Sequence, residues 1–284
     1  INIGEEDNFK GVVDLINWRG IVWNEHDMGM TFQEVEIPAD IIDEARQLRS
    51  ELLEAVAEVN PNIVLVLNNG RPLVLTWATQ NIPAIVEAWH LGTQSGNAIA
   101  QVLYGDYNPS GKLPMTFPRS VGQIPIYYNY KNTGRPSMNE PGSVFWSHYT
   151  DELNTPLYPF GYGLSYSKFE YSNLKLSNAS FSKGGNITVT VTVKNTGKFT
   201  GKEVVQLYIR DLVGKVVRPV KELKGFQKIF LKKGESKTVS FNITPEDLKF
   251  YDDELNFDWE SGEFDIMIGT NSAQVQTKRV NWEK

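Results

Sequence analysis

The chain has 284 residues, enough for about two domains of ordinary size. Its net charge is −6 and it contains no cysteine, which excludes a basic surface for nucleic acid or anionic membranes, structural disulfides and thiolate metal sites. No apolar run approaches the ~18–20 residues of a membrane span, and the first residue is Ile1 rather than Met. We therefore expect a fragment of a longer protein, and composition leaves its compartment open.

The first 58 residues predict a small α+β segment. FKGVVDLI and RGIVWNE carry the β-branched and aromatic residues of short strands and are bounded by glycines. IPADIIDEARQLRSELLEAVAE predicts a helix that begins near Pro38 and Asp40, with acidic residues at its positive end. One apolar face of this helix needs a packing partner; it consists of Ile41, Ala45, Leu48, Leu52 and Ala55.

Residues 59–165 change character. NIVLVLNNG has the continuous apolar run of a strand buried on both faces of a parallel sheet, and PAIVEAWHLG predicts a second such strand. SGNAIAQVLYGD predicts a helix that begins at Ser95 and stops at Gly105. This alternation indicates part of an α/β domain. Residues 106–165, rich in Pro, Gly, Asn and Tyr, predict a long ordered connector that packs through its aromatic side chains.

Residues 166–284 predict an all-β domain. In ITVTVTVK, apolar residues alternate with threonine and lysine without a fault, and VVQLYIRD, KTVSFNI and EFDIMIG repeat the pattern. Several short alternating strands separated by turns over about 100 residues are typical of a two-sheet sandwich.

Two long motifs carry a resemblance to a known family. WHLGTQSGNAIAQVLYGDYNPSGKLPMTFPRSVGQIP and LYPFGYGLSYSKFEYS resemble the C-terminal part of family 3 glycoside hydrolases of the bacterial β-glucosidase type, and the similarity extends over residues 59–284. It implies a parent with a barrel domain, an α/β sandwich domain and a fibronectin type III-like domain, of which this chain would hold the end of the second and all of the third. It also implies that the parent, a periplasmic or secreted enzyme, hydrolyses terminal β-linked sugars from oligosaccharides or aryl glycosides.

A second resemblance covers residues 1–58. EDNFKGVVDLI, together with EVEIPAD before a helix, is similar to the first domain of the translational GTPase elongation factor G, around its insert. We therefore expect a chimera with a seam near Glu58. The phosphate-binding motifs of a nucleotide site are missing, so GTP binding is not expected and a translation-factor fragment is the weaker alternative.

The family resemblance places no catalytic residue in this chain. Family 3 enzymes retain configuration and use two carboxyl groups, one as nucleophile and one as acid and base. The resemblance puts the nucleophile in the barrel and the acid/base residue on a loop upstream of IVLVLNNG. Glu5 and Glu6 imitate the end of such a strand, but their neighbours match the other family.

Candidate sugar-binding residues lie in FWSHYTDE, residues 145–152. In the family the corresponding loop lies toward the catalytic cleft, so stacking and hydrogen bonding to substrate would come from Trp146, His148, Tyr149 and Asp151. Anchoring of the connector is the favoured alternative role for these side chains. Their closeness in sequence does not make a catalytic triad, which requires geometry.

No cofactor or metal ion is expected, because the three histidines are isolated and lack the spacing of metal ligands. A non-catalytic carbohydrate- or protein-interaction module built on the sandwich stays open as an alternative. The sequence thus predicts a partial α/β domain at 59–165, a fibronectin type III-like β-sandwich at 166–284, and an α+β segment at 1–58.

Overall fold

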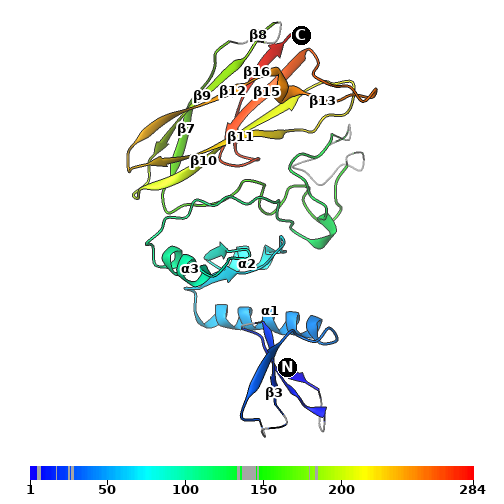
Figure 1. Ribbon diagram of the computed structural model, residues 1–284, viewed down its shortest axis with the longest axis vertical. Helices are drawn as coiled ribbons and strands as arrows, with labels where there is room; N and C mark the ends of the chain where they lie inside the picture. The colour runs from blue at the N-terminus through cyan, green and yellow to red at the C-terminus, as the bar shows by residue number, and fades with distance from the viewer. Residues whose placement is uncertain are drawn as a thin grey trace. The chain divides into compact units, whose positions relative to one another are not determined.

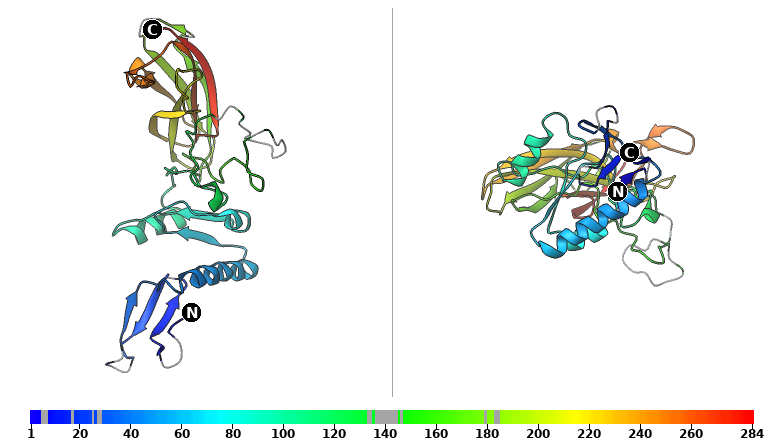
Figure 2. Two further views of the ribbon diagram at one scale, coloured as in Figure 1. Left: turned by 90° about the vertical axis from the view of Figure 1, so that its right-hand side faces the viewer. Right: turned by 90° about the horizontal axis from the view of Figure 1, so that it is seen from below.

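The computed structural model describes all residues except 5–7, 17, 25, 27–28, 133–134, 136–144, 146, 179 and 183–184. Figure 1 shows the chain from one side and Figure 2 from two more. The chain divides into two compact units, the first formed by residues 1–67 and 77–87 and the second by residues 68–76 and 88–284. The domain boundaries after residues 58 and 165 remain predictions.

The first unit begins with a four-stranded antiparallel sheet in the order β1-β2-β3-β4. The strands are Asn2–Ile3, Gly11–Asp14, Arg19–Trp23 and Phe32–Val35. Helix α1, Ile42–Val59, follows, and its Ala45 is fully buried among Ile3, Val13 and Ile37. The helix therefore starts later than Pro38, and only its first half has a core to pack on, since Leu52 and Val56 are exposed.

Strands β5, Val64–Leu67, and β6, Ala84–Glu87, form the predicted parallel pair, joined through the short helix α2, Thr76–Asn81. The prediction that β5 is buried on both faces was wrong, because Val64 is 48% exposed and the rest of the strand is half-buried. Strands β5 and β6 form a sheet of two strands, and the structure describes every residue from 51 to 100. So small a sheet has few neighbouring elements to cover it, which accounts for its exposure.

The second unit contains helix α3, Ser95–Leu103, at the position that the sequence predicted. A long connector then runs to the sandwich and includes a turn of 3-10 helix, Val121–Gln123. As predicted, the connector packs through aromatic side chains: Phe117 and Tyr158 meet edge to face at 6.3 Å between ring centroids, and Tyr158 stacks on Tyr162 at 5.0 Å. An ordered connector thus fixes the residues that lie against the sandwich.

The sandwich consists of a five-stranded sheet in the order β11-β10-β15-β16-β8 and a three-stranded sheet in the order β12-β9-β7, coloured green to red in Figure 1. Neighbouring strands are antiparallel except for the β16–β8 pair, and a small β13–β14 hairpin completes the domain. The strands are β7 Phe169–Leu176, β8 Ser180–Phe181, β9 Ile187–Asn195, β10 Gly201–Asp211, β11 Glu222–Leu231, β12 Ser236–Ile243, β13 Phe250–Tyr251, β14 Phe257–Asp258, β15 Gly262–Gly269 and β16 Val275–Trp282; a 3-10 turn, Pro245–Leu248, precedes β13.

The core of the sandwich follows from the alternation in the sequence. On β9, Ile187, Val189, Val191 and Val193 are all fully buried, whereas Thr188 and Lys194 on the other face are exposed. The facing sheet contributes side chains such as Ile266 and Ile268 on β15, also fully buried. Each such side chain contributes roughly 1.5–3 kcal/mol when it leaves water, so these two faces drive the folding of the domain.

Strand β10 is buried on both faces, because the connector packs against the face that points away from the sandwich core. Val205, Leu207 and Ile209 point into the sandwich core. Gln206 and Tyr208 alternate with them on the outer face of the sheet and are buried as well. The connector covers this outer face, because the Gln206 side-chain amide donates to the Gly161 carbonyl at 3.1 Å.

Candidate functional site

A cavity of about 1040 Å³ lies between the connector and the outer face of the five-stranded sheet. The connector supplies most of its wall, from Thr116 to Phe160. The sheet supplies Arg210 on β10, Asp265 and Met267 on β15 and Thr277 on β16. These sheet residues lie on the face opposite the sandwich core, because the alternating strand directs every second side chain outward.

Aromatic rings form the part of the cavity nearest the sheet. Tyr128 stacks on Phe160 with 4.2 Å between ring centroids and an interplanar angle of 17°. Tyr128 also meets Tyr208 edge to face at 5.9 Å, and its hydroxyl accepts a hydrogen bond from the Leu223 amide at 3.2 Å. Burial raises the pKa of Tyr208 above its usual value, and the same holds for Tyr130. The connector and sheet thus share one packed aromatic group.

A short turn at Ser147–Tyr149 also lines the cavity and is held by Asn154. The Asn154 side-chain oxygen accepts from the Tyr149 amide at 3.1 Å, and its side-chain nitrogen donates to the Ser147 carbonyl at 2.8 Å. This bridge fixes the backbone on both sides of His148, so the imidazole projects from a defined turn.

Arg119 and Gln123 fix the segment that carries Asn154. The Arg119 guanidinium Nε donates to the Thr155 carbonyl at 2.9 Å. Gln123, only 1% exposed, accepts from the Arg119 amide at 2.6 Å and donates to the Leu153 carbonyl at 2.6 Å. A buried amide with its hydrogen-bonding groups satisfied rigidifies a loop that has no sheet or helix of its own.

The predicted sugar-binding residues are placed differently by the structure. His148 and Tyr149 line the cavity, and Tyr149 is 38% exposed. Asp151 is exposed and is not among the lining residues. Trp146 lies outside the described residues, as do Glu5 and Glu6. The role of all four sugar-binding candidates stays a prediction.

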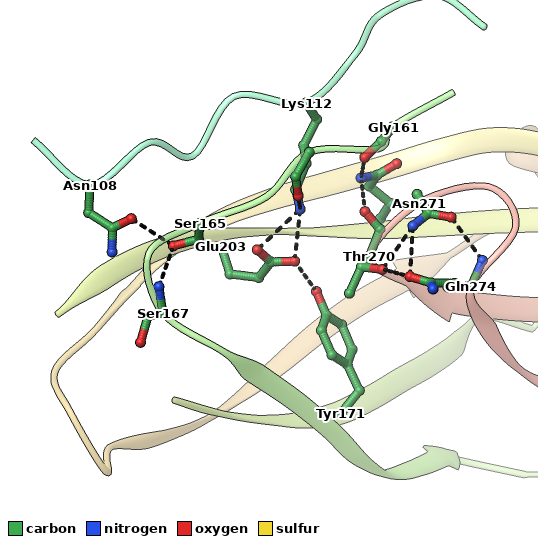
Figure 3. A network of polar contacts seen from close by, with 12 residues as sticks. Asn108, Lys112, Gly161, Ser165, Ser167, Tyr171, Glu203, Thr270, Asn271 and Gln274 are labelled. Atoms are coloured by element: carbon green, nitrogen blue, oxygen red, sulfur yellow. Dashed lines mark hydrogen bonds and ion pairs between the residues drawn. The ribbon is translucent and has the colours of Figure 1, made fainter. Parts of the chain in front are cut away.

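A buried polar network joins the connector to the sandwich (Figure 3). The Lys112 ammonium lies 3.3 Å from the Glu203 carboxylate and donates to the Gly163 carbonyl at 3.0 Å. The Tyr171 hydroxyl donates to Glu203 at 2.9 Å. Burial raises the pKa of Glu203, against the opposing effect of Lys112, and burial also raises the pKa of Tyr171.

The carboxyl groups with raised pKa values have structural contacts. A raised pKa in a cleft is a common sign of a catalytic acid. Besides Glu203, burial raises the pKa of Asp211, whose carboxylate lies 3.8 Å from Arg218 and accepts from the Val213 amide at 3.3 Å. Neither carboxyl group lines the cavity. The one carboxylate among the described lining residues, Asp265, is held by the Arg279 guanidinium at 2.9 Å.

Sequence reasoning missed the contribution of the sandwich to this cavity. The outer side of VVQLYIRD supplies Arg210 to the cavity wall, and Gln206 and Tyr208 on the same side are buried. Gln206 and Tyr208, a glutamine and a large aromatic residue at alternate positions of one strand, are the sequence signal that the outer face of β10 is covered. Lys112 lies in the predicted connector, and its partner Glu203 lies 91 residues away in the sequence.

The geometry defines a β-sandwich packed against an ordered connector from an α/β domain, with a cavity of about 1040 Å³ between the connector and the sandwich. Residues 36–166 match the glycosyl hydrolase family 3 C-terminal domain, and residues 203–272 match the fibronectin type III-like domain. The chain belongs to glycoside hydrolase family 3, of which it contains a C-terminal region.

Relatives support this assignment over most of the chain. The chain is 52% identical over 230 residues to the periplasmic β-glucosidase of Salmonella typhimurium, and the match covers 81% of this chain and 30% of that protein. It is 44% identical over 239 residues to thermostable β-glucosidase B of Acetivibrio thermocellus, covering 82% and 31%. The β-glucosidase of Listeria innocua, solved in complex with glucose, superimposes with a TM-score of 0.80 at 41% identity over 84% of this chain and 33% of that one.

The chain therefore spans about a third of the length of these relatives. The comparisons do not support the resemblance of residues 1–58 to elongation factor G, and the family 3 model already begins at residue 36. The seam near Glu58 stays a prediction. In the part of the chain that the structure describes, no helix has the length and apolar character needed to cross a membrane.

Proposed function

We propose that this chain supplies the C-terminal region of a retaining enzyme that removes terminal β-linked sugars from oligosaccharides or aryl glycosides. The observation that carries this proposal is the 52% identity to a periplasmic β-glucosidase, sustained through both the connector and the sandwich. Relatives named β-xylosidase are 46% and 44% identical, so β-glucosides and β-xylosides are the substrates to test. The name of the Salmonella relative makes the periplasm the proposed compartment.

In this proposal the Ser147–Tyr149 turn contributes to sugar binding. The hydrogen bonds of Asn154 hold the turn, so His148 and Tyr149 face the cavity without a large conformational change. An imidazole can hydrogen-bond a sugar hydroxyl, and a tyrosine ring can stack on a sugar face. Asp151 and Trp146 complete the proposed set, with Asp151 near the turn rather than in the cavity wall.

These 284 residues alone are proposed to be inactive. Retaining hydrolysis needs two carboxyl groups ~5–5.5 Å apart. The acidic residues near the cavity have other contacts or lie in the open: Glu152 is 3.9 Å from Arg119, Asp265 is bound to Arg279, and Asp151 is exposed. Because positioning and acid/base catalysis multiply, losing both reactive groups would leave only weak binding.

The test is release of chromophore from aryl β-glucoside and aryl β-xyloside by the purified 284-residue polypeptide, with Asp151→Asn measured in parallel. We expect no rate above that of buffer for either protein. Turnover that disappears in Asp151→Asn would show that the connector loop is itself an active site and would contradict the proposal.

The alternative is a non-catalytic carbohydrate-binding module. The aromatic cavity favours it as a second candidate, because ligand sites are concave and rich in aromatic residues. The two functions differ in what happens after the chain is joined to a catalytic barrel. A binding module would retain saccharide binding and add nothing to turnover.

A further inference from the structure

The cavity contains a cation whose charge is not neutralised by the described residues. Arg210 lies on β10 opposite Asp265 in the register of the sheet. That carboxylate is already engaged by Arg279, with contacts of 2.9 and 3.3 Å. Among the described residues, no carboxylate lies within ion-pair distance of Arg210. A half-buried guanidinium without a counterion is ready to bind an anion.

A second cation lies next to it. The Lys221 ammonium donates to the Ser272 carbonyl at 2.6 Å, and the Ser272 amide donates in turn to the Phe160 carbonyl at 2.9 Å. This chain of hydrogen bonds fixes the lysine at the junction of connector and sandwich. Ile209 and Glu222 are paired between β10 and β11, so Arg210 and Lys221 are the next residues along these two segments, and both line the cavity. Burial, and the charge of Arg210, lower the pKa of Lys221.

Like charges held together at the wall of a cavity raise the free energy of the empty site. An anion placed between them would relieve the repulsion and recover part of the desolvation cost of Lys221. The same cavity is lined by the stacked rings of Tyr128 and Phe160 and by Tyr130 on the connector. The wall thus combines two cations with aromatic surface.

We propose that this cavity binds a sugar ring that carries a carboxylate, a uronic acid residue, with Arg210 and Lys221 on the carboxylate and the aromatic group against the ring. A volume of about 1040 Å³ is large enough for a disaccharide. The choice of a saccharide rests on the proposed function, whereas the choice of an anion rests on the two cations. The site would select acidic oligosaccharides among the glycans offered to the enzyme.

Binding is measured by isothermal titration calorimetry on the 284-residue chain, which requires no turnover. The probes are a disaccharide of glucuronic acid β-linked to glucose, neutral cellobiose and inorganic phosphate. We expect the acidic disaccharide to bind at least tenfold more tightly than either of the others. Equal binding of the two disaccharides, or no binding of the acidic one at millimolar concentration, would overturn the proposal. Preferential binding of phosphate would also overturn it, since that shows an anion site without saccharide recognition.

Variants assign the effect to the two cations. Arg210→Met and Lys221→Met should each weaken binding of the acidic disaccharide about tenfold or more and leave cellobiose unchanged. Arg210→Lys should lose less affinity than Arg210→Met. Lys237→Met, at an exposed position on strand β12 of the other sheet, is the matched control and should bind as the parent does. Equal affinity in parent and folded Arg210→Met would refute the assignment, and a thermal melt of each variant establishes that it is folded. A loss of this binding would not bear on hydrolysis, which the chromophore assay measures.

Discussion

The ammonium of Lys112 lies 3.3 Å from the carboxylate of Glu203, and both side chains are largely buried where the connector meets the sandwich. Because the partners come from opposite sides of this junction, their ion pair ties a segment without regular structure to β10. Through this contact, and through Gly161 and Gln206, the irregular connector becomes a fixed wall of the cavity.

Breaking this ion pair should destabilise the second unit. Lys112→Met leaves Glu203 buried without its cation, which costs about 3–5 kcal/mol. Urea unfolding monitored by tyrosine and tryptophan fluorescence measures the loss. The double variant Lys112→Met with Glu203→Gln should recover much of the stability, because the buried charge is then gone. If Lys112→Met is as stable as the control Lys237→Met, the ion pair contributes nothing to the stability of the fold.

The stability of the chain should depend on pH through Glu203. Burial raises the pKa of this carboxyl in the folded chain above its usual value. A group of this kind stabilises the fold most when protonated, so its contribution is present at low pH and is lost as pH rises from the usual range of glutamate through the raised value. Relative to Glu203→Gln, the parent should lose stability as the pH rises above the usual pKa of a glutamate side chain. A parent that gains stability over this range would mean that the attraction of Lys112 outweighs burial.

Gly161 should be intolerant of a side chain. Its φ is +79°, and a Cβ atom there would lie 2.0 Å from the side-chain oxygen of Gln206. Gly161→Ala should therefore cost about 1–2 kcal/mol for the left-handed backbone alone and more for displacing Gln206. Gly111→Ala is the matched control in the same connector, because nothing lies within 4 Å of its Cβ position. Equal melting temperatures of the two variants would contradict the close approach.

The sandwich should fold as an independent domain. Residues 166–284 contain two complete apolar faces, and ~120 residues suffice for such a core. Expressed alone, they should melt cooperatively. Val191→Asp buries an unpaired charge, and its cost is comparable to the whole ~5–15 kcal/mol of domain stability, so this variant should be unfolded. Thr188→Asp on the exposed face of the same strand should melt near the parent. A non-cooperative parent would show that the domain depends on the connector.

Local patterns predicted the elements well and their surroundings less well. The alternation of β9 determined its buried face residue by residue, because a strand sends successive side chains to opposite sides. The apolar run of β5 does not report how many strands and helices cover it, so its exposure was not predictable. Helix α2 was missed because TWATQN is too short to show a period.

The cavity was only partly predictable for a similar reason. His148 and Tyr149 stood out as a polar and aromatic pair in a connector. Arg210 and Lys221 come from the sandwich, and nothing in the local sequence shows that the connector folds back onto the strand and the loop that carry them. Contacts such as Asn108 with the carbonyl of Thr200, 92 residues apart, depend on the tertiary fold.

The central claim is that these residues perform the role of the C-terminal region of a β-glucosidase. The most direct measurement grafts the family 3 portion of this chain onto the N-terminal part of the Salmonella typhimurium periplasmic β-glucosidase, in place of the segment it matches. Hydrolysis of aryl β-glucoside is then compared for the graft, the N-terminal part alone, and the graft with Val191→Asp. We predict turnover by the graft and none by the other two. A graft that is folded, as judged by a cooperative melt, yet hydrolyses no faster than the N-terminal part alone would contradict the account.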